Sequence, residues 1–191
     1  MPMVVEGSEK EIIEGCRRGE RDAFRALFEA YKNRVYSVAL RFSGDEATAS
    51  DIAQSTFLKL FSSIADFRGD ASFETWVYRL VVNRCLDHRR RTSRLVPIAE
   101  GLLGTLRSPS DSLSQVLRAE MSVHVRAAVD RLSPDLRMSI VLRYTEGLSY
   151  EQIAEAMGCS QGTVASRLNR AHKVLERRLS HLVNPKGGSN V

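Results

Sequence analysis

The strongest local signals for structure lie in residues 148–179, which read LSYEQIAEAMGCSQGTVASRLNRAHKVLERRL. Ser149 is followed three positions later by Gln152, the capping-box pattern that begins a helix. Gly158 can adopt the left-handed conformation that ends a helix, and Ser160 is placed to cap the next one. Two helices joined by so short a turn with a glycine predict a helix-turn-helix.

The second of these helices has an apolar stripe and a polar face. Apolar residues at offsets of four, seven and eleven are expected to pack inward: Val164, Leu168, Ala171 and Leu175. The opposite face carries hydrogen-bonding and basic side chains, which suit base edges and phosphates in a major groove. These candidate DNA-binding residues are Gln161, Thr163, Ser166, Arg167, Arg170 and Lys173. A solvated face on a helical hairpin is the alternative, but the coincidence of caps, turn glycine and basic face favours DNA binding.

A further helix is predicted just upstream. Ser133 and Pro134 combine a capping hydroxyl with the proline that is favoured at the first helical position. Gly147 is expected to end this helix. The C-terminal part of the chain is therefore a small helical module.

Residues 50–94 read SDIAQSTFLKLFSSIADFRGDASFETWVYRLVVNRCLDHRRRTSR and predict two more helices. Ser50 is expected to cap the first, whose inward residues are Ala53, Phe57, Leu60, Phe61 and Ile64. Its outer face presents Asp51, Gln54, Ser55, Leu58 and Lys59. An exposed leucine among polar residues is weak evidence for a partner surface, and ordinary surface explains it as well.

The second of these helices is long, and Ser72 is expected to cap it. The inward residues are Phe73, Trp76, Val77, Leu80 and Val81. The helix ends in a basic cluster of Arg84, His88, Arg89, Arg90, Arg91 and Arg94. Cations are favoured at any helix C-terminus, but arginines near aromatic residues also suit nucleic acid. The aromatic residues concerned are Phe67, Phe73, Trp76 and Tyr78.

The composition is that of an ordinary globular protein. The chain has 191 residues, 43% of them hydrophobic, and a net charge of +5, which permits a polyanionic partner without establishing one. We expect an all-α protein with no membrane span and no signal peptide, and hence a cytoplasmic location. Three widely spaced cysteines and four scattered histidines form no pattern typical of a metal, cofactor or catalytic site, which argues against an enzyme.

Pro97, Gly101, Gly104 and Pro109 interrupt the helical pattern and predict a flexible linker. The expected division is an N-terminal helical bundle at 9–95, the linker at 96–115, the helix-turn-helix module at 116–183 and a disordered tail at 184–191.

The order of these motifs resembles a known family. The N-terminal motifs are Asp51-x-x-Gln54-x-x-Phe57-Leu58, Phe67-Arg68-Gly69 and Phe73-x-Thr75-Trp76-Val77-Tyr78-Arg79-Leu80-x-x-Asn83. Together they resemble region 2 of sigma-70-type transcription initiation factors. The C-terminal motif, Gly162-Thr163-Val164-x-Ser166-Arg167-Leu168-x-Arg170-Ala171, resembles region 4. Two such modules with no domain between them resemble the extracytoplasmic-function (ECF, group 4) sigma factors.

This resemblance implies a promoter-specificity subunit of bacterial core RNA polymerase that assists promoter melting, without a cofactor or a small-molecule substrate. Asp51, Gln54 and Leu58 would bind the core polymerase, and the recognition helix would read the −35 element. The residues implied at the −10 element are Phe67, Asn83, Arg84, His88, Arg89, Arg90 and Arg91. Phe67 and Asn83 would help to hold a flipped base. The family also implies a stress-responsive anti-sigma factor as a partner.

Three positions depart from the family pattern. Ser55 stands where a glutamate is usual, Ala165 where a basic residue is common, and Asn169 where an apolar or aromatic one is common. No promoter sequence is therefore carried over from the family. The alternative function is a stand-alone helix-turn-helix regulator with an N-terminal sensing or dimerisation domain, which would bind a palindromic duplex without polymerase.

Overall fold

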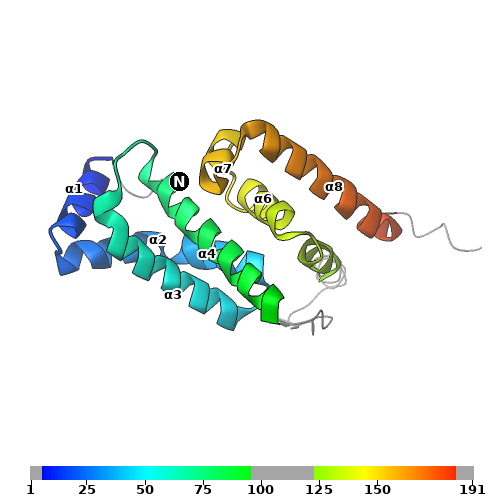
Figure 1. The fold of residues 1–191 in the computed structure, drawn as a ribbon, viewed down its shortest axis with the longest axis horizontal. Helices are drawn as coiled ribbons and strands as arrows, with labels where there is room; N and C mark the ends of the chain where they lie inside the picture. Colours follow the sequence, from blue (N-terminus) through cyan, green and yellow to red (C-terminus); the bar gives the residue numbers. More distant parts are fainter. Residues whose placement is uncertain (1–5, 96–122, 184–191) are drawn as a thin grey trace, which may run out of the picture.

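The computed structural model describes residues 6–95 and 123–183, and every regular element within them is helical (Figure 1). The prediction of two helical modules is therefore confirmed. The predicted linker at 96–115 and tail at 184–191 lie outside the described residues.

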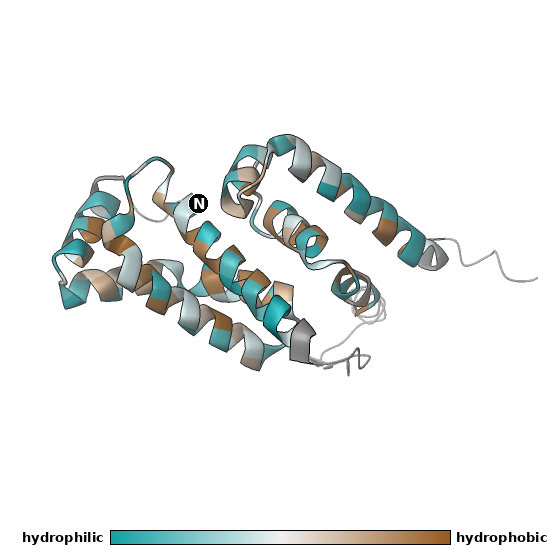
Figure 2. Cartoon of the chain, in the orientation of Figure 1, coloured by the Kyte–Doolittle hydropathy of each residue, from teal (hydrophilic) through white to brown (hydrophobic). Residues whose placement is uncertain are grey.

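The N-terminal module is a helical bundle. Its elements are α1 (Glu6–Arg17), α2 (Arg21–Ser43), α3 (Glu46–Ser63), the short 3-10 helix η1 (Ile64–Asp66) and α4 (Phe73–Leu95). Hydrophobic residues recur along each of the longer helices (Figure 2) and fill the space between α2, α3 and α4. The largest fully buried side chains of this module include Leu27, Ile52, Leu60 and Phe73. Burial of these faces, rather than helix propensity, holds the bundle together.

One helix start differs from its prediction. The helix expected to begin at Ser50 begins at Glu46, and Asp45 is its N-cap, with a carboxylate that accepts a hydrogen bond of 2.7 Å from the Thr48 amide. That bond lowers the pKa of Asp45. Gly44, with φ of 77°, ends α2 directly before it. Ser50 is thus an exposed residue inside α3, because the Gly44–Asp45 pair supplies a stronger stop and start signal.

The predicted cap of α4 is confirmed, because the Ser72 hydroxyl accepts a hydrogen bond of 3.1 Å from the Thr75 amide. The inward face was predicted only in part. Phe73, Val77 and Val81 are buried, whereas Trp76 is half-buried. Tyr78 is also buried, so Phe73 and Tyr78 belong to the core and not to an exposed aromatic surface.

The C-terminal module begins with a helical stretch at 123–130 and continues through α6 (Pro134–Tyr144), α7 (Tyr150–Met157) and α8 (Gln161–Val183). The capping box of α7 is complete: Gln152 N–H donates to Ser149 Oγ over 3.1 Å, and Ser149 N–H donates to Gln152 Oε1 over 2.9 Å. Gly158 adopts the predicted left-handed conformation, with φ of 61°. The Ser160 hydroxyl accepts from the Thr163 amide over 3.2 Å, as expected of the cap of α8.

The observed start and end of α6 differ from the predicted ones. Pro134 occupies the first turn, as predicted, but the Ser133 side chain makes no capping hydrogen bond. The helix ends at Tyr144, with Thr145 as its C-cap, so Gly147 lies in the following turn with φ of 71°. The helix-turn-helix itself has the predicted architecture.

The two modules pack against each other. In Figure 1, α4 lies beside α7, and α8 lies on the far side of α6 and α7 from the N-terminal bundle. The buried side chains of both modules form one continuous hydrophobic cluster. The relative placement of the modules is thus set by direct contact between them.

Candidate nucleic-acid and polymerase interface

The helix α8 presents the polar face that the sequence predicted. Its inward residues Val164, Leu168 and Ala171 are buried against α6 and α7. Four predicted DNA-binding residues are exposed on the outside: Gln161, Ser166, Arg170 and Lys173. Arg170 Nη2 donates to Ser166 Oγ over 2.9 Å, so these two side chains present one polar unit. Thr163 is half-buried, and its hydroxyl lies 2.9 Å from that of Ser160 in the cap.

Arg167 is placed differently from its neighbours on α8. Only 21% of its side chain is exposed, and its Nη2 lies 3.7 Å from Asp135 Oδ1 of α6. Its Nη1 lies 3.6 Å from Cys159 Sγ and 4.0 Å from Met157 Sδ. These contacts join α8 to α6 and to the turn before it.

The helix α4 carries the predicted basic cluster along its C-terminal half. Asn83 is exposed, Arg84 and His88 are half-buried, and the three arginines that follow are exposed: Arg89, Arg90 and Arg91. Arg90 forms an ion pair of 3.5 Å with Asp87. A run of exposed guanidinium groups on one helix is suited to phosphate contacts.

An aromatic group lies at the start of α4. The Phe67 ring is half-buried, with its centroid 5.1 Å from that of Phe73 and 5.4 Å from that of Trp76. Arg17 of α1 donates a hydrogen bond to the Phe67 carbonyl. This hydrogen bond links the turn that carries Phe67 to α1 of the bundle. The rings of Phe67 and Trp76 are partly exposed, and such rings can stack on an unpaired base.

The third candidate surface lies on α3. Asp51, Gln54 and Leu58 are exposed at spacings of three and four residues, so they share one face of the helix. Leu58 is 65% exposed, the greatest exposure among the large hydrophobic residues of the described chain. Phe28 of α2, 39% exposed, packs on the buried Phe57 of α3 with ring centroids 4.8 Å apart. A strongly exposed apolar side chain flanked by polar groups is a feature of protein-binding surfaces.

Comparison with known proteins gives these surfaces a common context. Residues 27–95 match the family model of sigma-70 region 2, and residues 123–175 match that of sigma-70 region 4. The RNA polymerase sigma-H factor of Pseudomonas aeruginosa is 33% identical over 95% of this chain and 98% of its own length. The ECF RNA polymerase sigma-E factor of Escherichia coli K12 is 34% identical over 92% of this chain and 96% of its own length.

The chain belongs to the sigma-70 family, as an extracytoplasmic-function sigma factor. Its function is that of an RNA polymerase sigma factor in transcription initiation. Solved structures share the fold: the sigma factor RpoE of Bartonella quintana, in complex with the anti-sigma factor NepR, has a TM-score of 0.64 at 24% identity. That match covers 82% of this chain and 96% of the RpoE chain. CnrH, in complex with the cytosolic domain of CnrY, has a TM-score of 0.63 at 23% identity and covers 94% of this chain and 99% of its own.

The cysteines Cys16 and Cys85 are buried in the N-terminal bundle of this sigma factor. Burial raises the pKa of the Cys16 thiol to about 11, with a smaller contribution from the charge of Glu20. Burial also raises the pKa of the Cys85 thiol to about 12. Both thiols are therefore protonated at neutral pH. Among the described residues, no cluster of histidine, cysteine and acidic side chains could hold a metal ion. No helix in residues 6–95 or 123–183 is long and apolar enough to cross a membrane.

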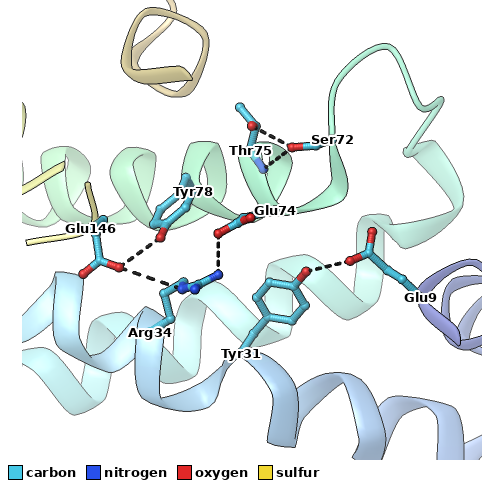
Figure 3. Close-up of polar contacts among 8 residues, drawn as sticks. All are labelled: Glu9, Tyr31, Arg34, Ser72, Glu74, Thr75, Tyr78 and Glu146. Carbon is cyan, nitrogen blue, oxygen red and sulfur yellow. Dashed lines mark hydrogen bonds and ion pairs between the residues drawn. The ribbon is translucent and has the colours of Figure 1, made fainter. Parts of the chain in front are cut away.

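The sequence analysis missed a polar cluster in which both modules of the sigma factor take part (Figure 3). Tyr78 of α4 donates a hydrogen bond of 2.9 Å to Glu146, which follows α6. Arg34 of α2 pairs with Glu74 and lies 3.9 Å from the same Glu146 carboxylate. Burial is the main cause that raises the pKa of Tyr78 well above its usual range, and the negative charge of Glu146 is the second. Sequence periodicity could indicate that Tyr78 is buried, but not which distant carboxylate it meets.

Proposed function

We propose that this sigma factor uses three separate surfaces in transcription initiation: α3 for core RNA polymerase, α4 with its preceding turn for the −10 element, and α8 for the −35 element. The observation that carries the proposal is that residues of the family motifs are exposed on three different helices. Asp51, Gln54 and Leu58 lie on α3, Asn83 on α4, and Arg170 on α8. A surface residue with no packing role is free to serve a partner.

The α3 surface binds the clamp-helix coiled coil of the largest polymerase subunit. Leu58 supplies an apolar anchor, while Asp51 and Gln54 supply polar contacts at its edge. Ser55 is half-buried, and its hydroxyl bonds to the Ile52 carbonyl over 2.9 Å. Ser55 has no carboxylate, so it does not supply the charged contact that the family glutamate makes.

The −10 surface captures an unpaired base and neighbouring phosphates. Taking a base out of the stack costs roughly a few kcal/mol, which contacts to the flipped base can offset. Phe67 provides a stacking face, and the exposed amide of Asn83 provides hydrogen bonds. Arg84, His88 and the three arginines after it add phosphate contacts, which make binding depend steeply on salt.

The −35 surface is the outer face of α8. Gln161, Ser166, Arg170 and Lys173 are exposed and carry the donors and acceptors that base edges and phosphates require. Thr163 contributes near the helix start, where its hydroxyl already belongs to the cap. Arg167 acts by holding α8 in position through Asp135, and it reaches DNA only if that ion pair is broken.

We also propose the domain division 9–95 and 116–183, a cytoplasmic location where polymerase acts, and no catalytic activity of the chain by itself. An anti-sigma factor is proposed as a partner. The support for it is that the similar folds of RpoE and CnrH were solved with NepR, an anti-sigma factor, and with the cytosolic domain of CnrY.

The proposal is tested by promoter selection. Sigma-free core polymerase, loaded with this protein, is mixed with sheared genomic DNA, and retained fragments are sequenced. The expected result is enrichment of a small set of fragments with two shared elements, which neither polymerase nor protein enriches alone. Enrichment of a palindromic site by the protein alone would instead identify a stand-alone helix-turn-helix regulator.

A further inference from the structure

We infer that Arg17, at the end of α1, is a positioning residue for promoter melting: it holds the turn at residues 67–72, the Phe67 turn, in the conformation that captures an unpaired base. This inference rests on the proposed function, because it uses the assignment of Phe67 to the −10 element. The motifs that carry that assignment begin at Asp51, and the match to sigma-70 region 2 begins at residue 27. The helix α1 ends before both, so neither gives it a role.

The Phe67 turn has few contacts that fix its shape. Residues 68–70 are exposed, and the turn lies outside the helices on either side of it. Its backbone is held at the two ends, where Phe67 N–H donates to the Ile64 carbonyl over 3.2 Å and Ser72 caps α4. Among the described residues, Arg17 is the one side chain outside the flanking helices that hydrogen-bonds to the turn. It donates to the carbonyl of Phe67, the residue whose ring faces the unpaired base in the proposed function.

Arg17 uses both terminal nitrogens of its guanidinium. Nη1 pairs with Glu14 Oε1 over 2.5 Å, one turn earlier in α1, and Nη2 donates to the Phe67 carbonyl. Glu14 therefore orients the group that holds the turn. A planar guanidinium presents these two donors in a fixed relation, whereas the single ammonium of a lysine does not. Because the donor is charged, its bond to the carbonyl is stronger than a bond between neutral groups.

The helix that carries Arg17 is itself packed tightly on the bundle. Ile13 and Cys16 of α1 are buried in the hydrophobic core. Gly15 lies so close to α2 that a Cβ at this position would be 2.7 Å from Ala23 Cβ, and only glycine permits that approach. The end of α1 therefore has little freedom to move relative to α2, and Arg17 extends from a fixed base.

Holding the Phe67 carbonyl also restricts the Phe67 ring. The centroid of that ring lies 5.1 Å from the centroid of Phe73 and 5.4 Å from that of Trp76, so a shift of the backbone at Phe67 would disturb both contacts. A binding surface that is already ordered loses less conformational entropy when its ligand arrives than one that must be ordered on binding. Arg17 therefore favours base capture without contacting the DNA.

The fluorescence of the free protein tests whether Arg17 holds the turn. Trp76 is the only tryptophan of the chain, so its emission reports the packing of the Phe67 ring beside it. In Arg17→Lys we expect Trp76 to emit at longer wavelength and to be quenched more strongly by acrylamide than in the wild-type protein. Arg18→Lys is the matched control, because Arg18 pairs with Glu20 over 2.6 Å. Equal emission and equal quenching for the two variants would overturn the inference.

A double-mutant cycle in the holoenzyme tests whether this positioning serves melting. The rate at which unpaired thymines become reactive to permanganate is measured on a promoter retained in the genomic selection. We expect Arg17→Lys to slow melting roughly tenfold through loss of a charged hydrogen bond, and Arg18→Lys to leave the rate unchanged. Phe67→Ala removes the ring that Arg17 positions, so adding Arg17→Lys to it should slow melting by less than about twofold further. Multiplication of the two single effects would make Arg17 independent of Phe67 and overturn the inference.

The two readouts separate failure of this inference from failure of the proposed function. A wild-type holoenzyme that melts no promoter would contradict the proposed function, whereas quenching of Trp76 in the free protein would still decide whether Arg17 holds the turn. An active wild-type holoenzyme, with Arg17→Lys melting at the same rate, would contradict the inference alone. Circular dichroism of each variant checks that the helices remain folded.

Discussion

The guanidinium of Arg167 lies 3.7 Å from the carboxylate of Asp135, so the recognition helix α8 is tied to α6 by a residue that sequence alone places among the DNA-reading side chains. The neighbouring Arg170 donates a hydrogen bond to Ser166 on its own helix and is exposed. Arg167 is thus a packing residue, whereas Arg170, three positions later, is a surface residue. Their substitution should separate stability from DNA recognition.

We expect Arg167→Ala to lower the free energy of unfolding by about 1 kcal/mol, since it removes a partly buried side chain and its ion pair. The measurement is urea denaturation followed by circular dichroism. Lys173→Ala, an exposed residue of the same helix, is the control and should change stability by less than about 0.5 kcal/mol. Equal free energies of unfolding for the two variants would show that the contact between Arg167 and Asp135 does not stabilise the fold.

Arg170→Ala should weaken binding to a −35 duplex roughly tenfold without affecting stability, because a good base contact contributes about 1–3 kcal/mol. Fluorescence anisotropy with a labelled duplex measures the affinity. Binding to core polymerase is measured on the same sample and should not change. Loss of polymerase binding would mean that the two modules have been assigned to the wrong partners.

If α4 holds a flipped base as proposed, Asn83→Ala should slow open-complex formation by roughly tenfold, since the exposed amide is lost. Permanganate reactivity of unpaired thymines reports melting. The matched control is Asn33→Ala, an exposed asparagine of α2. If duplex binding and melting fall by the same factor, Asn83 has no specific role in base capture.

Leu58→Asp should reduce affinity for core polymerase at least tenfold, because a charge replaces the exposed apolar anchor of α3. It should leave the fold intact, since 65% of Leu58 is already exposed. Val123→Asp, at an exposed apolar residue of the other module, is the control. Co-purification with core polymerase gives the result, and undiminished recovery of the Leu58→Asp variant would exclude α3 as the docking surface.

The buried thiols predict how stability depends on alkaline pH. Cys16 and Cys85 have folded pKa values of about 11 and about 12, above the value near 9 of an exposed thiol. The folded state therefore holds these protons more tightly than the unfolded state. Stability should be fully present below about pH 9 and should fall as pH rises toward 11 and 12. Thermal melting at a series of pH values measures this, and Cys85→Ala should reduce the steepness of the decline. A melting temperature that does not fall over this range would contradict the burial of these groups.

Local signals were sufficient to predict much of the fold and the exposure of most candidate residues on α3 and α8. The capping box at Ser149 and the left-handed turn at Gly158 depend on residues within one helical turn, so sequence spacing predicts them. Ser50 was wrongly predicted to cap α3 because a serine hydroxyl can accept a hydrogen bond from a helix N-terminus. The actual start is set by Gly44, which ends α2, and by Asp45, which caps α3.

Contacts between distant residues could not be predicted in this way. The side chain of Arg167 turns inward because an acidic residue of another helix lies within reach, and periodicity carries no information about that partner. Tyr78 resembles an aromatic residue of a DNA surface in the sequence, but in the structure it is buried and bonds to Glu146 of the other module, which lies 68 positions away. Both features arise from packing between elements.

The most direct test of the central claim is transcription from a defined template. Sigma-free core polymerase, this protein and a supercoiled plasmid carrying a selected promoter are combined, and the 5′ ends of the transcripts are mapped. The account predicts one discrete start that requires both proteins and that Asn83→Ala weakens while Asn33→Ala does not. Random starts identical to those of core polymerase alone, from protein that binds polymerase and is fully folded, would contradict it.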